Sequence, residues 1–261
     1  MAEKNITLSI AIATYNEEKN IARCLQSVAS FTDEVMLVDG RSTDKTVSIA
    51  KTFGAHIIET NNPSIFHINK QKALVACKGE WILQLDADEV IPDNLREEIL
   101  SITNKKENGG TNGYFIPRKN YFWGHVMKKG GQYPDYVMRL VRRGKASFPC
   151  KSVHEQIAVD GKVGYIIHPM LHYSYMTRAD YWKKADTYIK LTAQELVKNH
   201  TYSHPMQVVT YFFIKPISTF FSIFLRHKGF IDGLTGFEFS LYSAFHFPLA
   251  YIKGLSLRNT T

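Results

Sequence analysis

The chain has 261 residues, of which 44% are hydrophobic and 21% charged, and this composition indicates a globular protein with a sizeable core. Its three cysteines are widely spaced and form no Cys-x-x-Cys pair, which excludes a zinc finger and favours a reduced, cytoplasmic compartment. The net charge of +8 suits phosphorylated substrates, an anionic membrane or nucleic acid, but the sequence carries no signature of a nucleic-acid-binding module.

Short apolar strands alternate with amphipathic helices in the first part of the chain. Strands are predicted at 6–13, 35–38, 55–58 and 81–85, and the helix before the last of them at 67–77. Continuous apolar strands separated by helices are typical of a parallel sheet that is covered on both faces. The expected fold class is therefore α/β, Rossmann-like, with a mostly parallel sheet.

The middle of the chain continues with a helix at 94–102 and a polar loop at 105–112. Later strands are predicted at 114–116, 136–141 and 163–167. The stretch 117–135 between two of them is rich in glycine, aromatic residues and lysine, and it is long enough to be a functional loop.

The C-terminal part is predicted to be helical, with a polar helix at 178–200 and two apolar segments at 205–225 and 234–252. Lys215 lies in the middle of the first segment, and a charge at the centre of a bilayer is costly. We therefore expect interfacial amphipathic helices rather than two membrane spans. The alternative is a helical subdomain packed on the core, or an oligomer interface. The predicted domains are 1–176 and 177–261.

Acidic residues stand where two of the predicted strands end. Asp86 and Asp88 follow the strand 81–85, and Asp39 ends the strand 35–38. Ligands of open α/β sheets bind at the carboxyl ends of strands, and paired carboxylates suit Mg²⁺ or Mn²⁺. The alternative for Asp39 is a turn or helix N-cap residue, and that for the pair is a solvated acidic loop.

Three motifs resemble those of the family 2 glycosyltransferases, which have the GT-A fold: Ala13-Thr14-Tyr15-Asn16-Glu17-Glu18, Val38-Asp39-Gly40-Arg41-Ser42-Thr43-Asp44-Lys45-Thr46 and Gly79-Glu80-Trp81-Ile82-Leu83-Gln84-Leu85-Asp86-Ala87-Asp88-Glu89. Later residues are similar to the branch that adds sugars to lipopolysaccharide core: Tyr133-Pro134-Asp135, Arg139-Leu140, Val153-His154-Glu155 and Lys228-Gly229-Phe230-Ile231-Asp232-Gly233.

This resemblance implies a nucleotide-diphosphate sugar donor, with UDP-glucose as the main expectation, and Mg²⁺ or Mn²⁺ as cofactor. The implied donor-binding residues are Thr14, Tyr15, Glu17, Asp39, Lys70, Gln71 and Asp86. The implied metal ligands are Asp86, Asp88 and His172. For Lys70 the alternative is an ordinary surface lysine, and for His172 a structural histidine.

The resemblance also implies an inverting transfer, which needs one general base for the acceptor hydroxyl. Glu155 is the expected base and Asp135 the second choice. The alternative for Glu155 is a surface carboxylate paired with an arginine. Basic residues are expected to gather around the loop 117–135 and to bind phosphates: Arg118, Lys119, Lys128, Lys129, Arg139, Arg142 and Arg143.

The resemblance implies lipopolysaccharide core or a lipid-linked saccharide as the acceptor. It also implies that the protein is peripheral to the inner face of the cell membrane. One alternative is transfer to polyprenyl phosphate or another cell-surface glycan. A non-enzyme alternative is a basic protein that binds membranes or nucleic acid, although the acidic strand ends argue against it. A homo-oligomer is left open, and no nucleic-acid partner is expected.

Overall fold

The computed structural model describes residues 6–63, 65–105, 109–151, 155–199, 201–203 and 205–258. The chain forms two compact units. The first, here called the sheet unit, comprises Met1–Arg118 and Tyr136–His172, and the second, the helical unit, comprises Lys119–Asp135 and Tyr173–Thr261.

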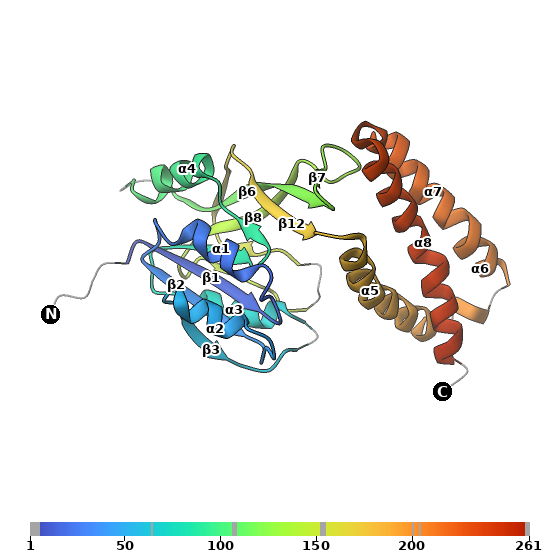
Figure 1. The fold of residues 1–261 in the computed structure, drawn as a ribbon, viewed down its shortest axis with the longest axis horizontal. Coiled ribbons are helices and arrows are strands. Elements are labelled where there is room, and N and C mark those ends of the chain that lie inside the picture. The colour runs from blue at the N-terminus through green and yellow to red at the C-terminus, as the bar shows by residue number, and fades with distance from the viewer. Residues whose placement is uncertain are drawn as a thin grey trace. The chain divides into compact units, whose positions relative to one another are not determined.

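A mixed β-sheet forms the core of the sheet unit (Figure 1). Its strands follow the order β3 (His56–Glu59), β2 (Glu34–Asp39), β1 (Leu8–Thr14), β4 (Trp81–Asp86), β8 (Asp135–Arg142), β6 (Thr111–Phe122), β12 (Met170–Tyr175) and β5 (Glu89–Val90). Strands β3, β2, β1 and β4 are parallel, and β8 is antiparallel to β4. The mostly parallel sheet predicted from sequence is thus found in its first four strands, and antiparallel strands extend it.

Smaller strands complete the sheet. The strands β11 (Lys162–Tyr165) and β7 (His125–Val126) both pair with β6. A separate two-stranded sheet joins β9 (Ala146–Ser147) to β10 (Ala158–Val159).

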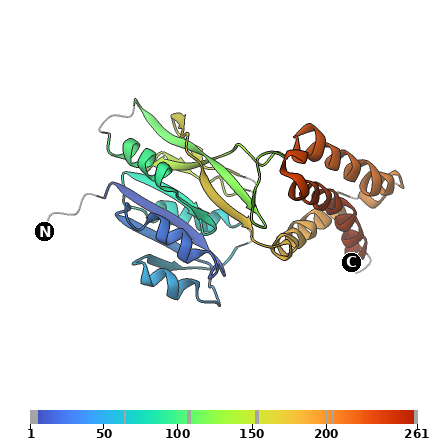
Figure 2. The same cartoon turned by 45° about the horizontal axis from the view of Figure 1, so that its top comes forward.

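Helices cover both faces of the sheet, as the sequence predicts (Figures 1 and 2). Strand side chains alternate, so Ile10 of β1 packs in one cluster while Ala11 packs in the other. The first cluster includes residues of α1 (Ile21–Val28), α2 (Thr46–Thr52) and α4 (Asp93–Thr103). The second includes residues of α3 (His67–Ala76).

The predicted functional loop 117–135 is wrong at its start, because β6 continues to Phe122 and β7 follows at His125–Val126. The polar side chains of this stretch interrupt the apolar pattern from which a strand is predicted. Asn120 is buried, but its amide donates to the carbonyl of Gln132 at 2.9 Å and to Asp135 Oδ2 at 3.2 Å. A buried polar group that is satisfied in this way is compatible with a strand.

The helical unit contains α5 (Arg178–Lys198), an almost unbroken helix over Met206–Arg226, and α8 (Gly233–Arg258). The middle helix consists of α6 (Met206–Val209) and α7 (Lys215–Phe221), each followed by a π-helical stretch, at Thr210–Ile214 and Ser222–Arg226. Short 3₁₀ turns at Thr201–Ser203 and Gly229–Asp232 connect the helices.

Packing within the helical unit joins α5 to α8 through Ile189, Leu196 and Ala250. A capping box starts α5, since Thr177 and Asp180 each accept a hydrogen bond from the other's backbone N–H. The helical C-terminal region expected from sequence is therefore present. The sequence predicted a domain boundary at 176/177. In the structure the C-terminal part of the helical unit starts at Tyr173, and the earlier segment Lys119–Asp135 belongs to the same unit.

Length and apolar composition single out one helix in the described part of the chain, Met206–Arg226, as sufficient to cross a membrane. Its most apolar 18-residue stretch has a mean hydropathy of 1.7, and only 6% of it is buried.

A carboxylate on α4 stabilises the sheet unit. Glu98 accepts hydrogen bonds from the backbone N–H groups of Ile167 at 2.9 Å and His168 at 3.0 Å, and Glu98 Oε2 lies 2.7 Å from His168 Nδ1. Burial alone would raise the pKa of Glu98, but these hydrogen bonds outweigh it and lower the pKa.

We predict that Glu98→Gln lowers the free energy of unfolding by about 2 kcal/mol at neutral pH, because charge-assisted bonds are lost. The lowered pKa means that this stability is present above the usual glutamate range and disappears as the pH falls through the folded-state value. Urea unfolding at several pH values measures it, with the exposed Glu97→Gln as control. A difference from wild type that is constant down to acid pH would contradict the prediction.

Candidate active site

The carboxyl ends of three neighbouring strands meet at one edge of the sheet. In the parallel register Thr14 of β1 lies beside Asp39 of β2, and Ala13 lies beside Asp86 of β4. The strands β2 and β4 flank β1 on opposite sides, so the chain changes direction across the sheet at this point. Such a topological switch point is where open α/β sheets bind ligands.

The loops after β1 and β2 hold each other in place. The backbone N–H of Asn16 donates to Ser42 Oγ at 2.9 Å, and Asn16 Oδ1 accepts from the N–H of Thr43 at 2.8 Å. The N–H of Glu17 donates to the buried Thr46 Oγ1 at 2.8 Å. Asn16 adopts a left-handed φ of 55°, which asparagine tolerates better than most residues. The two loops therefore form one rigid rim.

Asp39 is buried beneath this rim and is satisfied by protein groups. Its carboxylate accepts from Ser42 N–H at 2.7 Å, Ser42 Oγ at 2.6 Å and Thr14 Oγ1 at 3.1 Å. The turn-holding alternative from the sequence is thus realised in the structure. A carboxylate has about four acceptor sites, so contact between Asp39 and a nucleotide stays a prediction.

The other residues expected at the nucleotide lie on the same rim. Tyr15 follows Thr14 and is 46% exposed, which leaves its ring available for stacking. Glu17 is half-buried, and its Oε2 accepts from Asn20 Nδ2 at 2.9 Å.

A network of buried charges lies at the end of β4. Arg139 of β8 is 6% exposed and donates from one nitrogen to Asp86 Oδ2 at 2.8 Å and to Glu89 Oε1 at 2.7 Å. Arg139 also bonds to the side-chain oxygen of Gln84, and Lys70 of α3 forms an ion pair with Asp86 Oδ1. Lys70 is therefore part of the site rather than an ordinary surface lysine.

The charges of this network decide the protonation of Asp86. Burial alone would raise its pKa, but the cations of Arg139 and Lys70 outweigh burial and hold the pKa of Asp86 well below its usual range. The neighbouring carboxylates also act on Cys24, whose thiol donates to the Asp86 carbonyl at 3.6 Å. Burial and the charges of Glu89, Asp88 and Asp86 raise the pKa of Cys24 well above its usual value, so this thiol is neutral.

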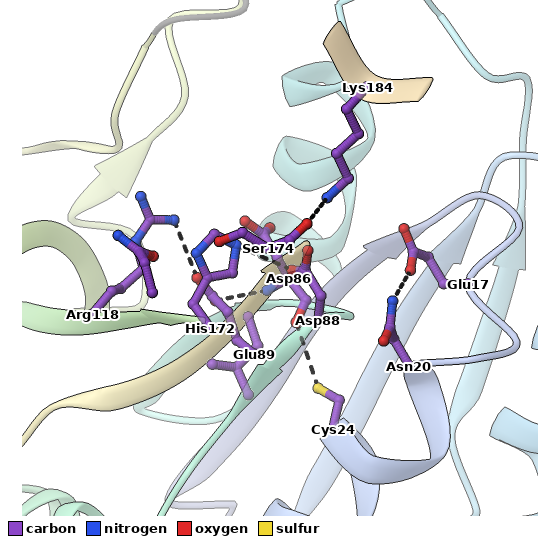
Figure 3. Close-up of polar contacts among 12 residues, drawn as sticks. Glu17, Asn20, Cys24, Asp86, Asp88, Glu89, Arg118, His172, Ser174 and Lys184 are labelled. Carbon is purple, nitrogen blue, oxygen red and sulfur yellow. Dashed lines mark hydrogen bonds and ion pairs between the residues drawn. The ribbon is translucent and has the colours of Figure 1, made fainter. Parts of the chain in front are cut away.

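Asp88 and His172 form a second pair (Figure 3). The strand β5 pairs antiparallel with β12 and places Glu89 opposite His172, which brings His172 Nε2 to 3.5 Å from Asp88 Oδ1. Both side chains are largely buried. Arg118 approaches Glu89 from β6, with Nη1 3.5 Å from Glu89 Oε1 (Figure 3).

The fit to a divalent ion differs between the two aspartates. Among the described residues no group of three or more His, Cys, Asp or Glu side chains is arranged to hold a metal. Both oxygens of Asp86 face cations, whereas Asp88 and His172 offer one oxygen and one nitrogen side by side. Because Mg²⁺ is commonly held by one or two carboxylates together with substrate phosphates, this pair suits an ion that binds with a diphosphate.

Gln71, the amide expected at the diphosphate or ribose, has a structural contact through its oxygen, and its contact with a donor stays a prediction. Its Oε1 accepts from the backbone N–H of Phe148 at 2.7 Å. This bond ties α3 to the segment that follows β9.

The two candidate bases lie in different compact units. Glu155 belongs to the sheet unit, and both of its oxygens accept from the backbone N–H of Lys151, at 2.9 and 3.0 Å. The rest of its motif, Val153 and His154, lies outside the described residues. Asp135 belongs to the helical unit and accepts from Asn120.

The basic residues that were expected in one cluster are divided between the units. Lys119, Lys128 and Lys129 belong to the helical unit, whereas Arg118 and Arg139 lie in the sheet unit and contact the carboxylate network. That these residues form a single phosphate-binding cluster stays a prediction, because its members belong to both units.

Glu89 and Gln84 are the site residues that the sequence reasoning missed. Glu89 is fully buried, and it accepts from the Asp86 N–H at 2.9 Å as well as from Arg139. The available signal was a polar or charged residue inside an otherwise apolar strand, namely Gln84 in β4 and Arg139 in β8, because such a residue requires a buried partner.

We predict that Arg139→Met lowers the free energy of unfolding by about 3 kcal/mol or more, because it leaves buried carboxylates uncompensated. The double variant Arg139→Met/Glu89→Gln should lose less than the sum of the two single changes, since the two groups are paired. Urea unfolding measures both, and the exposed Arg143→Met is the control. Losses that simply add would contradict a pairing between Arg139 and Glu89.

Comparisons with known proteins bear on this site. The family model described as "Glycosyl transferase family 2" matches residues 9–154. An uncharacterized glycosyltransferase of Rickettsia prowazekii is 30% identical and aligns over 97% of this chain and 88% of its own length. The lipopolysaccharide core biosynthesis glycosyltransferase LpsC of Rhizobium meliloti is 27% identical over 92% of this chain and 91% of its own.

Among solved structures, TarS of S. aureus (residues 1–349) is 16% identical with a TM-score of 0.48, and the match covers 97% of this chain and 92% of TarS.

Proposed function

The chain belongs to glycosyltransferase family 2 and has a GT-A-like fold, and we propose that it transfers a hexose from UDP-glucose or a similar nucleotide-diphosphate sugar to lipopolysaccharide core or a related lipid-linked saccharide. The observation that carries the proposal is the gathering of Thr14, Asp39, Asp86 and Asp88 at the switch point of the sheet. The relative LpsC supports the choice of acceptor.

The donor would lie along the edge where β2, β1 and β4 end. Tyr15 is exposed there and suits stacking on the base, while the rigid rim of the two loops would hold the ribose. Asp88 and His172 would hold Mg²⁺ or Mn²⁺ together with the diphosphate. When bound, the ion supplies positive charge that stabilises the departing diphosphate.

Asp86 binds the ribose of the donor in this proposal. It stays ionised because Arg139 and Lys70 face its two oxygens, and it is thereby fixed next to Asp88. A carboxylate in this state accepts hydrogen bonds from ribose hydroxyls without having to lose a proton first.

Glu155 is the proposed general base. It would take the proton of the acceptor hydroxyl while that oxygen attacks the anomeric carbon from the face opposite the diphosphate, which inverts the configuration. The backbone N–H of Lys151 orients the carboxylate through two hydrogen bonds.

We also propose that the protein works as a peripheral protein at the inner face of the cell membrane, where such an acceptor is presented. Along Met206–Arg226 the large side chains of Phe213, Ile217 and Phe221 are more than half exposed. Lys215 does not interrupt this apolar face, because its ammonium lies 3.9 Å from the ring centre of Tyr211, within the unit. An exposed apolar helix face that ends in a basic residue, Arg226, suits the membrane interface.

Replacement of Asp88, the proposed metal ligand, tests the donor site. We predict that Asp88→Asn weakens Mn²⁺-dependent binding of the donor by roughly 100-fold or more, because loss of a ligand should cost at least as much as loss of one of its outer-shell partners. Titration calorimetry with UDP-, GDP-, ADP- and dTDP-sugars, with Mn²⁺ or with EDTA, measures the loss and identifies the sugar. The exposed Asp93→Asn serves as control. Equal binding by wild type and Asp88→Asn would refute this site.

Glu155→Gln tests the base. We predict that it lowers kcat about 10²- to 10⁴-fold while donor affinity is unchanged, because only proton removal is lost. Asp160→Asn provides a matched change at an exposed carboxylate. A larger loss in Asp135→Asn would transfer the role of base to Asp135, and full activity of Glu155→Gln would favour a phosphate acceptor such as polyprenyl phosphate, which needs no strong base.

A further inference from the structure

One motif of the chain has no role in the proposed reaction, namely Lys228-Gly229-Phe230-Ile231-Asp232-Gly233. It forms the turn between the helix Met206–Arg226 and α8, within the helical unit. In Figure 1 the loop that follows β7 reaches this turn. We call residues 125–130 and 226–234 together the basic tip.

A buried carboxylate holds the two parts of the basic tip together. The side chain of Asp232 is fully buried and accepts from the backbone N–H groups of Lys128 and Lys129, both at 2.8 Å. His125 Nε2 lies 3.0 Å from the same carboxylate. Asp232 thus fixes the backbone under the two lysines.

Close backbone packing fixes the other side of the turn. A Cβ at Gly229 would come within 2.8 Å of the Ile223 carbonyl oxygen, so only glycine fits there. The N–H of Gly130 donates to the carbonyl of His227 at 2.9 Å. Gly130, Gly229 and Asp232 therefore form the structural framework of the tip.

Most of the large side chains of the basic tip are exposed, whereas Met127 is buried. The exposed apolar ones are Phe230 at 50%, Ile231 at 49% and Leu234 at 68%. The charged ones are exposed cations: Lys128, Lys129, Arg226 and Lys228. Such a framework presents both basic and apolar side chains at one turn.

The charge of this surface has one sign. Residues 125–130 and 226–234 are all described, and their one acidic side chain, Asp232, is buried and bonded within the protein. A nucleic acid would satisfy the cations but would leave Phe230 and Ile231 in water. An anionic bilayer satisfies both, because phosphates bind the cations and the headgroup region takes up the apolar side chains.

We propose that the basic tip is a docking site for anionic phospholipids, in which the four cations bind headgroup phosphates and Phe230 and Ile231 enter the interface. This inference rests on the proposed membrane-bound function and deepens it, since it names the lipid chemistry and the residues that recognise it. The apolar face of the neighbouring helix Met206–Arg226 adds contact area of the same kind.

Cosedimentation of the full chain with phosphatidylcholine vesicles, with and without phosphatidylglycerol, tests the site. Lys128→Ser/Lys129→Ser should lower the partition coefficient on phosphatidylglycerol vesicles roughly 30-fold, at about 5-fold for each cation removed. Lys183→Ser/Lys198→Ser removes the same charge from exposed positions of α5 and should bind like wild type. Thermal unfolding confirms that both variants are folded.

The apolar part of the tip has a separate test. Phe230→Ser/Ile231→Ser should weaken vesicle binding roughly 10-fold or more. That loss should persist at about 0.5 M salt, where the contribution of the lysines is screened.

Three outcomes would overturn the proposal: equal losses in the two lysine variants, binding that does not depend on phosphatidylglycerol, or tip variants that lose affinity for a duplex oligonucleotide while vesicle binding is unchanged. Donor titration of the same variants separates this inference from the proposed function. Intact donor binding with lost vesicle binding is the expected pattern for the tip variants. Wild-type protein that binds phosphatidylglycerol vesicles but no donor would leave the tip standing while the donor site failed.

Discussion

The arrangement at the end of β4 depends on one buried guanidinium. Arg139 lies in an apolar strand between Met138 and Leu140, and a cation in such a place is costly unless anions compensate it. Asp86 and Glu89 provide this compensation. Asp86 in turn is held ionised and in place, so the contact that compensates the buried cation also prepares the proposed donor site.

Much of the sheet unit could be predicted from the sequence, because its signals are local. Apolar runs and helical spacing predicted the strands β1 to β4 and the helices α3 and α4 to within a few residues. The predicted strand 114–116 is shorter than β6, because the polar residues Arg118, Lys119 and Asn120 are typical of a loop. In the structure a hydrogen bond to Gln132 satisfies Asn120. The membership of Lys119–Asp135 in the helical unit depends on Asp232, more than 100 residues away, and no local pattern predicts such a contact.

The candidate site divides in the same way. Thr14, Asp39 and Asp86 are expected neighbours, because each ends a strand and parallel strands end at one edge. The partners of these residues were not predictable with equal ease. Each polar group has several possible partners, and only the folded chain determines which of them it contacts. Gln71 thus bonds to the backbone of Phe148, and Glu89 accepts from Arg139. The roles of these residues toward a substrate stay predictions.

The rim made by the loops after β1 and β2 has an evolutionary consequence. Asn16 and Glu17 are held by groups that lie 26 to 29 positions further along the chain, including Thr43 and Thr46. Each of these bonds joins a side chain of one loop to a backbone N–H of the other, so a substitution at Asn16, Ser42 or Thr46 leaves an N–H of the opposite loop without its partner. Across homologues these three side chains should therefore be retained together, even where the helix between them drifts freely.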